Sequence, residues 1–214
     1  MSNSTFDFNA FVRESKEVLV NPKSYFSTMK TTGGIVEPLI KAIIYGVIAG
    51  IIVFLWSIIG LGAFTGGVFG GTIGIMALVW YVIAAIIGLF IGAVILLIIS
   101  SICQGSTDFE ANMRVTASVM VIMPISALLV FTSGINLTLG TIVGLAVNLF
   151  ALWLLYNGLV EALKAKPATS KILILVLAAL LVLFMLIGMG TRNRVMKQFD
   201  NSEVEEVLKD LETD

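Results

Sequence analysis

Two long stretches of this chain contain no charged residue. No Asp, Glu, Lys or Arg lies between Lys41 and Asp108, or between Arg114 and Glu161. The surface of a water-soluble fold needs polar side chains, whereas about 20 consecutive apolar residues cross the hydrocarbon core of a bilayer. Charged residues make up 13% of the chain, against about 25% in an average protein. The uncharged runs therefore predict a polytopic membrane protein.

The two runs hold four segments that are each long enough to cross a membrane as a helix, and a shorter uncharged run, 172–191, holds a fifth. A small-residue return (60–72), a polar connector (100–114), a tight hairpin (132–136) and a charged loop (161–170) separate them. We predict spans at residues 39–59, 73–99, 115–131, 139–159 and 171–189. The expected fold is all-α, a bundle of five transmembrane helices in residues 39–190.

Both ends of the chain show the pattern of an amphipathic helix. Residues 1–38 form a first segment in which Phe8, Phe11 and Leu19 recur at helical spacing among charged residues. Asn21 and Pro22 end that pattern, because proline disfavours a helical conformation at the preceding residue. The acidic tail, 191–214, repeats apolar residues at spacings of three and four from Val204 to Leu211. We expect the first helix to lie on the membrane or the bundle, and the tail helix to dock on this bundle, another copy or a partner.

The distribution of Lys and Arg predicts the orientation. Seven of these residues lie near the span ends on the amino-terminal side and three on the other side. Because basic residues collect in cytoplasmic loops, we expect a cytoplasmic amino terminus. Five spans then place the carboxyl tail on the outside. A re-entrant segment at 60–72 would move the tail to the cytoplasmic side.

The composition argues against several classes of function. The chain has no histidine and one cysteine, Cys103, so His-based catalysis, an internal disulfide and CxxC redox or metal sites are excluded. A net charge of −1 gives no basic surface for nucleic acid. We expect the spans to be free of ionisable groups, which argues against an ion-coupled transporter, because such a transporter usually places ionisable groups in the membrane. We therefore expect no catalytic residue, metal or cofactor, and membrane lipids as partners.

Glycines repeat at four-residue spacing in and between the first two spans. Small residues four apart let helices approach closely in lipid. The glycines of this chain therefore predict helix contacts, within the bundle or between copies. The stretch 62–71 is also consistent with a loop. The expected packing residues are Gly62, Gly66, Gly70, Gly74, Gly88 and Gly92, and the same spacing recurs at Gly46 and Gly50 in the first span.

Charged residues in the polar connectors form the best candidate site. Glu110 and Arg114 are four residues apart, so they share a helical face at the membrane boundary. Glu161 lies on the same predicted side, and we expect it to approach Arg114, either as part of a binding site or as an ion pair that holds the bundle together. Pro124 should kink the third span. Asn148, in the fourth span, should form an interhelical hydrogen bond.

Several short motifs follow one another along the chain. They are Asn21-Pro22-Lys23-Ser24-Tyr25-Phe26, then Gly105, Phe109, Glu110, Arg114 and Val115, then Pro124, and finally Gly158-Leu159, Glu161-Ala162 and Lys166. Their order resembles the bacterial branch of the Yip family, membrane proteins that interact with Ypt/Rab GTPases. Cys103 and Gln104 stand where that family commonly has two glycines, and Ser118 where it usually has an aromatic residue.

The resemblance implies a function outside catalysis. Eukaryotic members have a cytoplasmic amino terminus and five spans, and they bind prenylated small GTPases and one another. We therefore expect a non-enzymatic scaffold or adaptor in a bacterial inner membrane, which binds other membrane proteins or a second copy, and a small GTPase only if it acts like the eukaryotic members. The alternative is a conduit for lipids or small neutral molecules along residues 60–72, Pro124 and Asn148.

Overall fold

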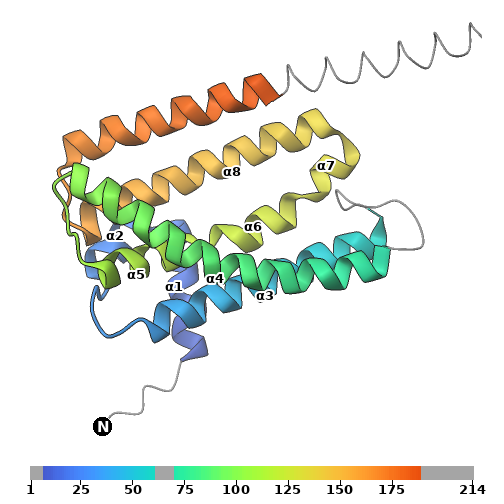
Figure 1. Ribbon diagram of the computed structural model, residues 1–214, viewed down its shortest axis with the longest axis horizontal. Helices are drawn as coiled ribbons and strands as arrows, with labels where there is room; N and C mark the ends of the chain where they lie inside the picture. Colours follow the sequence, from blue (N-terminus) through green and yellow to red (C-terminus); the bar gives the residue numbers. More distant parts are fainter. Residues whose placement is uncertain (1–6, 61–69, 189–214) are drawn as a thin grey trace, which may run out of the picture. The chain divides into compact units, whose positions relative to one another are not determined.

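Every regular element is helical in the described part of the chain, residues 7–60 and 70–188 of a computed structural model (Figure 1). Side chains are described for these residues except 70–75 and 77. The elements are α1 (Phe8–Val20), α2 (Pro22–Thr28), α3 (Val36–Ile59), α4 (Gly70–Ile102), α5 (Phe109–Val119), α6 (Ile122–Leu129), α7 (Phe131–Ile135), α8 (Leu137–Asn157) and the π-helical turn η1 (Gly158–Ala162). A last helix occupies Pro167–Gly188.

The prediction of five spans is confirmed. The segments long and apolar enough to cross a membrane are Val36–Ile59, Leu78–Ile102, Phe109–Ile135, Leu137–Ala162 and Pro167–Gly188. Their ends differ from the predicted ones mainly because the first and third begin with charged turns. Capping side chains fix where the third and fourth spans begin. Asp108 accepts a hydrogen bond from Ala111 N at the start of the third, and Asn136 accepts from Thr138 N and Leu139 N at the start of the fourth.

The third span is not one helix but three, α5, α6 and α7. Pro124 has no N–H to donate to the carbonyl of Met120, and Met120 instead accepts from Met123 N at 2.9 Å. The expected kink is thus present, just before Pro124. A second break lies at Val130, where Thr132 Oγ1 donates to the carbonyl of Leu129.

The amino-terminal segment contains the predicted amphipathic helix and a second helix that the pattern did not predict. Asp7 caps α1 by accepting from the backbone N–H groups of Asn9 and Ala10. α1 buries Phe11 and Val18. Pro22 ends α1 as expected, but it also starts α2, because proline fits the first turn of a helix.

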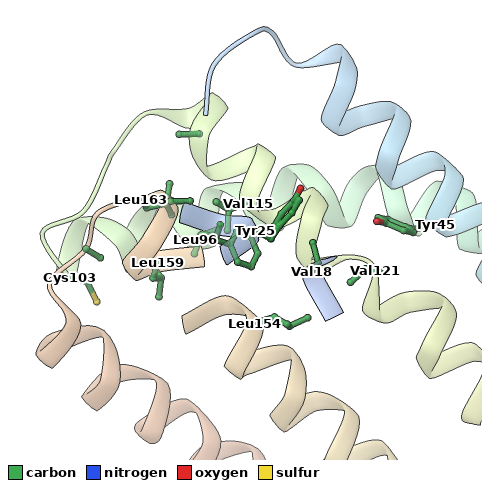
Figure 2. Packing of buried hydrophobic residues seen from close by; sticks show 14 of the residues in the cluster. Val18, Tyr25, Tyr45, Leu96, Cys103, Val115, Val121, Leu154, Leu159 and Leu163 are labelled. Carbon is green, nitrogen blue, oxygen red and sulfur yellow. The ribbon is translucent and has the colours of Figure 1, made fainter. Parts of the chain in front are cut away.

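Residues 7–60 and 70–175 of the described chain belong to one unit, and Val176–Gly188 continue the last helix in a second. In the first unit α3 packs along α4 and also contacts α6, while α8 contacts α6 and α7 (Figure 1). Its core gathers side chains from many elements at one end, among them Val18, Tyr25, Leu96, Val115, Leu154 and Leu159 (Figure 2).

The glycines divide into tight and open positions. A Cβ on Gly46 would lie 2.8 Å from Ala85 Cβ and 3.0 Å from the Tyr81 carbonyl oxygen, and Gly50 faces Leu78 as closely. A Cβ on Gly92 would meet Thr116, whereas one on Gly88 would meet nothing within 4 Å. Gly62, Gly66 and the tail helix of 191–214 lie outside the described residues, and Gly70 and Gly74 begin α4 where side chains are not described.

This division predicts that Gly46→Ala destabilises the bundle and that Gly88→Ala does not. The first places a methyl group against the backbone of α4 and should cost about 1–3 kcal/mol of unfolding free energy. The second has open space in the chain and should be neutral or stabilising by up to about 1 kcal/mol. Thermal unfolding of both variants in detergent checks the difference, and equal effects would contradict the packing described here.

Candidate functional site

A buried arginine forms the centre of the charged cluster at one end of the bundle. Arg114, in the second turn of α5, has a side chain that is 6% exposed. Its Nη1 donates to Glu37 Oε2 and its Nε to Glu110 Oε1, both at 2.9 Å. Its Nη2 donates to the carbonyl of Gly34 at 2.9 Å. One guanidinium therefore joins α5, the start of α3 and the loop before it.

The loop over Arg114 depends on its two glycines. Gly33 has a φ of +133°, a conformation that L side chains rarely adopt, and a Cβ there would lie 2.9 Å from Arg114 Nη2. Gly34 also donates its N–H to Glu110 Oε1 at 2.6 Å. The pair thus closes the loop on the Arg114–Glu110 ion pair.

Lys41 extends the cluster to the amino-terminal helix. Its ammonium lies 2.6 Å from Glu14 Oε2 on α1 and 3.1 Å from Glu37 Oε1. One turn further along α3, the Tyr45 hydroxyl is 2.8 Å from Ser15 Oγ, and its ring packs against Phe11. These contacts hold α1 against the spans.

The position of these charges corrects the expectation that the spans are free of ionisable groups. Glu37 and Lys41 lie in the first spanning helix, and Glu110 and Arg114 in the third. A buried charge is tolerated when it is paired and hydrogen-bonded, and each of these four has an opposite charge within 3.1 Å. The i, i+4 spacing of Glu37 and Lys41 was the signal in the sequence that could have identified them.

A polar pocket of about 290 Å³ lies beside the cluster. Tyr25 and Ser118 line it in the interior, and their hydroxyl oxygens are 3.0 Å apart. Burial raises the pKa of the Tyr25 hydroxyl above its usual value, so it remains a protonated donor. The charged side chains that line the pocket are Arg13, Glu14, Glu17, Lys30, Glu37, Lys41 and Arg114.

Three sequence motifs that are far apart in the chain meet next to this cluster. α2, with the buried Pro22 and Phe26, packs on η1, where a Cβ on Gly158 would touch Val115 and Phe26. The model of one family, the Yip1 domain, matches residues 16–189 and so includes all three motifs.

The chain belongs to the Yip1 domain family. Comparison with curated proteins and with solved structures gave no match. The resemblance in the sequence is thus confirmed at the level of the family.

Two connectors of the Yip1 domain are hydrogen-bonded to each other through the backbone. Ser106 N donates to the Leu163 carbonyl at 2.7 Å, and Lys166 N donates to the Cys103 carbonyl at 2.8 Å. Gly105 lies where a Cβ would be 2.9 Å from Ala165 Cβ. Close approach of the two connectors therefore requires a glycine at 105.

The expected approach of Glu161 to Arg114 is wrong. Glu161, in η1, lies 3.9 Å from Lys23 of α2, and Lys23 is largely exposed. Arg114 is occupied by Glu37 and Glu110. The connectors that carry Glu110 and Glu161 do meet, as expected, but through backbone groups rather than through an ion pair.

Two further motif residues, Asn21 and Phe109, lie at the ends of helices. Asn21 joins α1 to α2, and Phe109 begins α5 with a partly exposed ring. Asn148 donates to the Gly144 carbonyl of its own helix, so the expected interhelical bond is not formed. Among the described residues, no three His, Cys, Asp or Glu side chains are grouped to hold a metal.

Removal of the central arginine should destabilise the Yip1 domain. Arg114→Ala leaves Glu110 and Glu37 without their buried partner, and we expect a loss of about 2–4 kcal/mol in unfolding free energy, since Glu37 keeps partial access to solvent. Lys23→Gln removes an exposed ion pair and should cost less than about 1 kcal/mol. Chemical unfolding in detergent measures both, and a wild-type stability of Arg114→Ala would show that the cluster does not hold the helices.

A second prediction concerns the first connector. Gln104 has a φ of +57°, which costs a non-glycine residue about 1–2 kcal/mol, and it stands where the family resemblance expects glycine. Gln104→Gly should therefore preserve or raise stability by up to about 1 kcal/mol. Gln104→Val, a β-branched residue at the same φ, should lower the melting temperature, and the opposite order of the two variants would refute the strain.

Proposed function

We propose that this Yip1-domain protein is a non-enzymatic membrane scaffold or adaptor that binds another membrane protein or a second copy through its spans. The single observation that supports this is the outward face of α4. Along that face, large apolar side chains are exposed over most of the helix, from Val79 and Trp80 to Ile98 and Ile102. Among them lies Gly88, with open space beside its Cα.

The face of α4 has the form that transmembrane partners use. In lipid, helices associate by close packing, and a small residue flanked by large ones forms a notch for a neighbouring backbone. Ala84, Gly88 and Gly92 follow the four-residue spacing of such contacts. Gly92 is used inside the chain, against Thr116, so Gly88 is the position that remains for a partner.

The geometry favours this adaptor over the conduit. A groove of about 260 Å³ lies between α4, α5, α6 and α8, but no polar surface lines it. A path for a polar headgroup or a polar solute needs hydrogen-bonding groups along its length. Asn148, the expected polar residue of such a path, is bonded to its own helix.

We also propose that the protein lies in a bacterial inner membrane with its amino terminus in the cytoplasm. The excess of Lys and Arg on the amino-terminal side supports a cytoplasmic amino terminus, and the resemblance to the bacterial branch supports an inner membrane. A prenylated small GTPase would be the partner only if this chain acts like the eukaryotic members.

The test is photocrosslinking in native membranes from position 87, next to the notch. We expect an adduct with a protein, which Gly88→Ile abolishes because the larger side chain fills the notch. Gly144→Ile is the matched control, because Gly144 on α8 also has nothing within 4 Å of an added Cβ.

The products distinguish the outcomes. An adduct of twice the mass of the chain identifies a second copy, and any other adduct identifies a different protein. Adducts with lipid alone, or protein adducts that persist in Gly88→Ile, would overturn the adaptor proposal at this face.

A further inference from the structure

The pocket beside the charged cluster retains cationic donors that the chain does not use. A guanidinium has five N–H groups and an ammonium three. Arg114 directs three of its N–H groups to Glu37, Glu110 and the Gly34 carbonyl. Lys41 has two carboxylate partners, Glu14 and Glu37. Both side chains line the pocket, so N–H groups remain there for an acceptor that the described part of the chain does not supply.

Exposed charges on the pocket wall are also unpaired. Arg13 and Glu17 lie one turn apart on α1, and Lys30 follows α2. None of the three forms an ion pair within the described part of the chain, where the five ion pairs involve other residues. Four basic and three acidic side chains line the pocket, which gives it a net charge of +1 (4 − 3).

Apolar side chains are exposed next to this polar pocket. Val12 adjoins Arg13, and Ile35 and Val36 adjoin Glu37; they are 51%, 47% and 64% exposed. Further along α3, beyond apolar residues that are partly or fully buried, Ile48, Ile51 and Leu55 are exposed as well. A polar, positively charged pocket beside an apolar helix face fits a molecule with an anionic head and an apolar tail.

We propose that this pocket binds the phosphodiester of an anionic membrane phospholipid whose acyl chains lie along α3. Arg13 and Lys30 contact the phosphate oxygens from the wall, and the spare N–H groups of Lys41 and Arg114 contact them from the interior. A phosphodiester carries one negative charge, which balances the net charge of the pocket. Basic pockets at the ends of transmembrane helices recognise lipid headgroups in this way. This inference does not depend on the adaptor role, which concerns the face of α4.

Substitution of Glu17 is expected to strengthen binding, a result that a loss of folding cannot produce. Glu17 lies on the same wall, and no ion pair in the described chain neutralises it. It repels a phosphate, so Glu17→Gln should bind the phospholipid more tightly. Arg13→Gln and Lys30→Gln should each weaken binding by about fivefold, the effect of one basic residue near a phosphate.

The experiment is a titration of the purified full-length protein in detergent, with bound lipid counted by native mass spectrometry. The probes are phosphatidylglycerol, diacylglycerol with the same acyl chains, and inorganic phosphate. Lys16→Gln is the matched control, because Lys16 is exposed on α1, has no ion pair in the described chain and does not line the pocket.

We expect phosphatidylglycerol to bind and diacylglycerol not to bind. Binding should weaken in Arg13→Gln and Lys30→Gln, strengthen in Glu17→Gln and stay unchanged in Lys16→Gln. Equal binding of the two lipids would overturn the phosphate contact. Competition by inorganic phosphate at the same concentration as the lipid would overturn the lipid as its source. Wild-type affinity in both Arg13→Gln and Lys30→Gln would show that the phospholipid does not bind in this pocket.

Discussion

The ion pairs of Arg114 are the interaction on which the arrangement of the first unit depends. A guanidinium with little access to solvent needs carboxylate and carbonyl partners, and Arg114 finds them in its own helix, in α3 and in the loop before α3. The same carboxylate, Glu37, also pairs with Lys41, and Lys41 pairs with Glu14 of α1. The register between α3 and α5, the loop before α3 and the position of α1 are therefore fixed together.

Concentration of charge at one end has consequences for the remaining surface. Because the charged residues of α3 and α5 are paired with one another, the described spans can present apolar side chains over the rest of their length. A partner inside the bilayer would then be recognised by close packing rather than by charge. For this reason we base the adaptor proposal on the open position at Gly88 and not on a polar residue of the spans. A ligand at the charged end meets the opposite conditions, and there Arg13, Lys30 and Glu17 remain available.

The sequence predicted what depends on local pattern and missed what depends on distant partners. Uncharged runs located five spans, periodicity located α1, and Pro124 located one break in the third span. The spacing of Glu110 and Arg114 predicted one ion pair, but Glu37, 77 residues before Arg114, could be assigned to it only in three dimensions. Glu161 was assigned to Arg114 because both are charged and near a span end; the two connectors instead pair through backbone groups, which a charge pattern does not reveal.

Most of the Yip1 motif residues have a structural role in the described chain. Phe26 is fully buried, Gly105 allows the close approach of the two connectors, and Gly158 leaves space for the side chains of Val115 and Phe26. Where this chain departs from the family pattern at Ser118, the Ser118 hydroxyl lies 3.0 Å from the Tyr25 hydroxyl in a buried position. Of the residues that we propose to select partners, Gly88, Arg13 and Lys30 lie outside these motifs, and Arg114 lies within them. Substitution at the three positions outside the motifs leaves the packed contacts intact, so members of one family can retain the fold while they change what they bind.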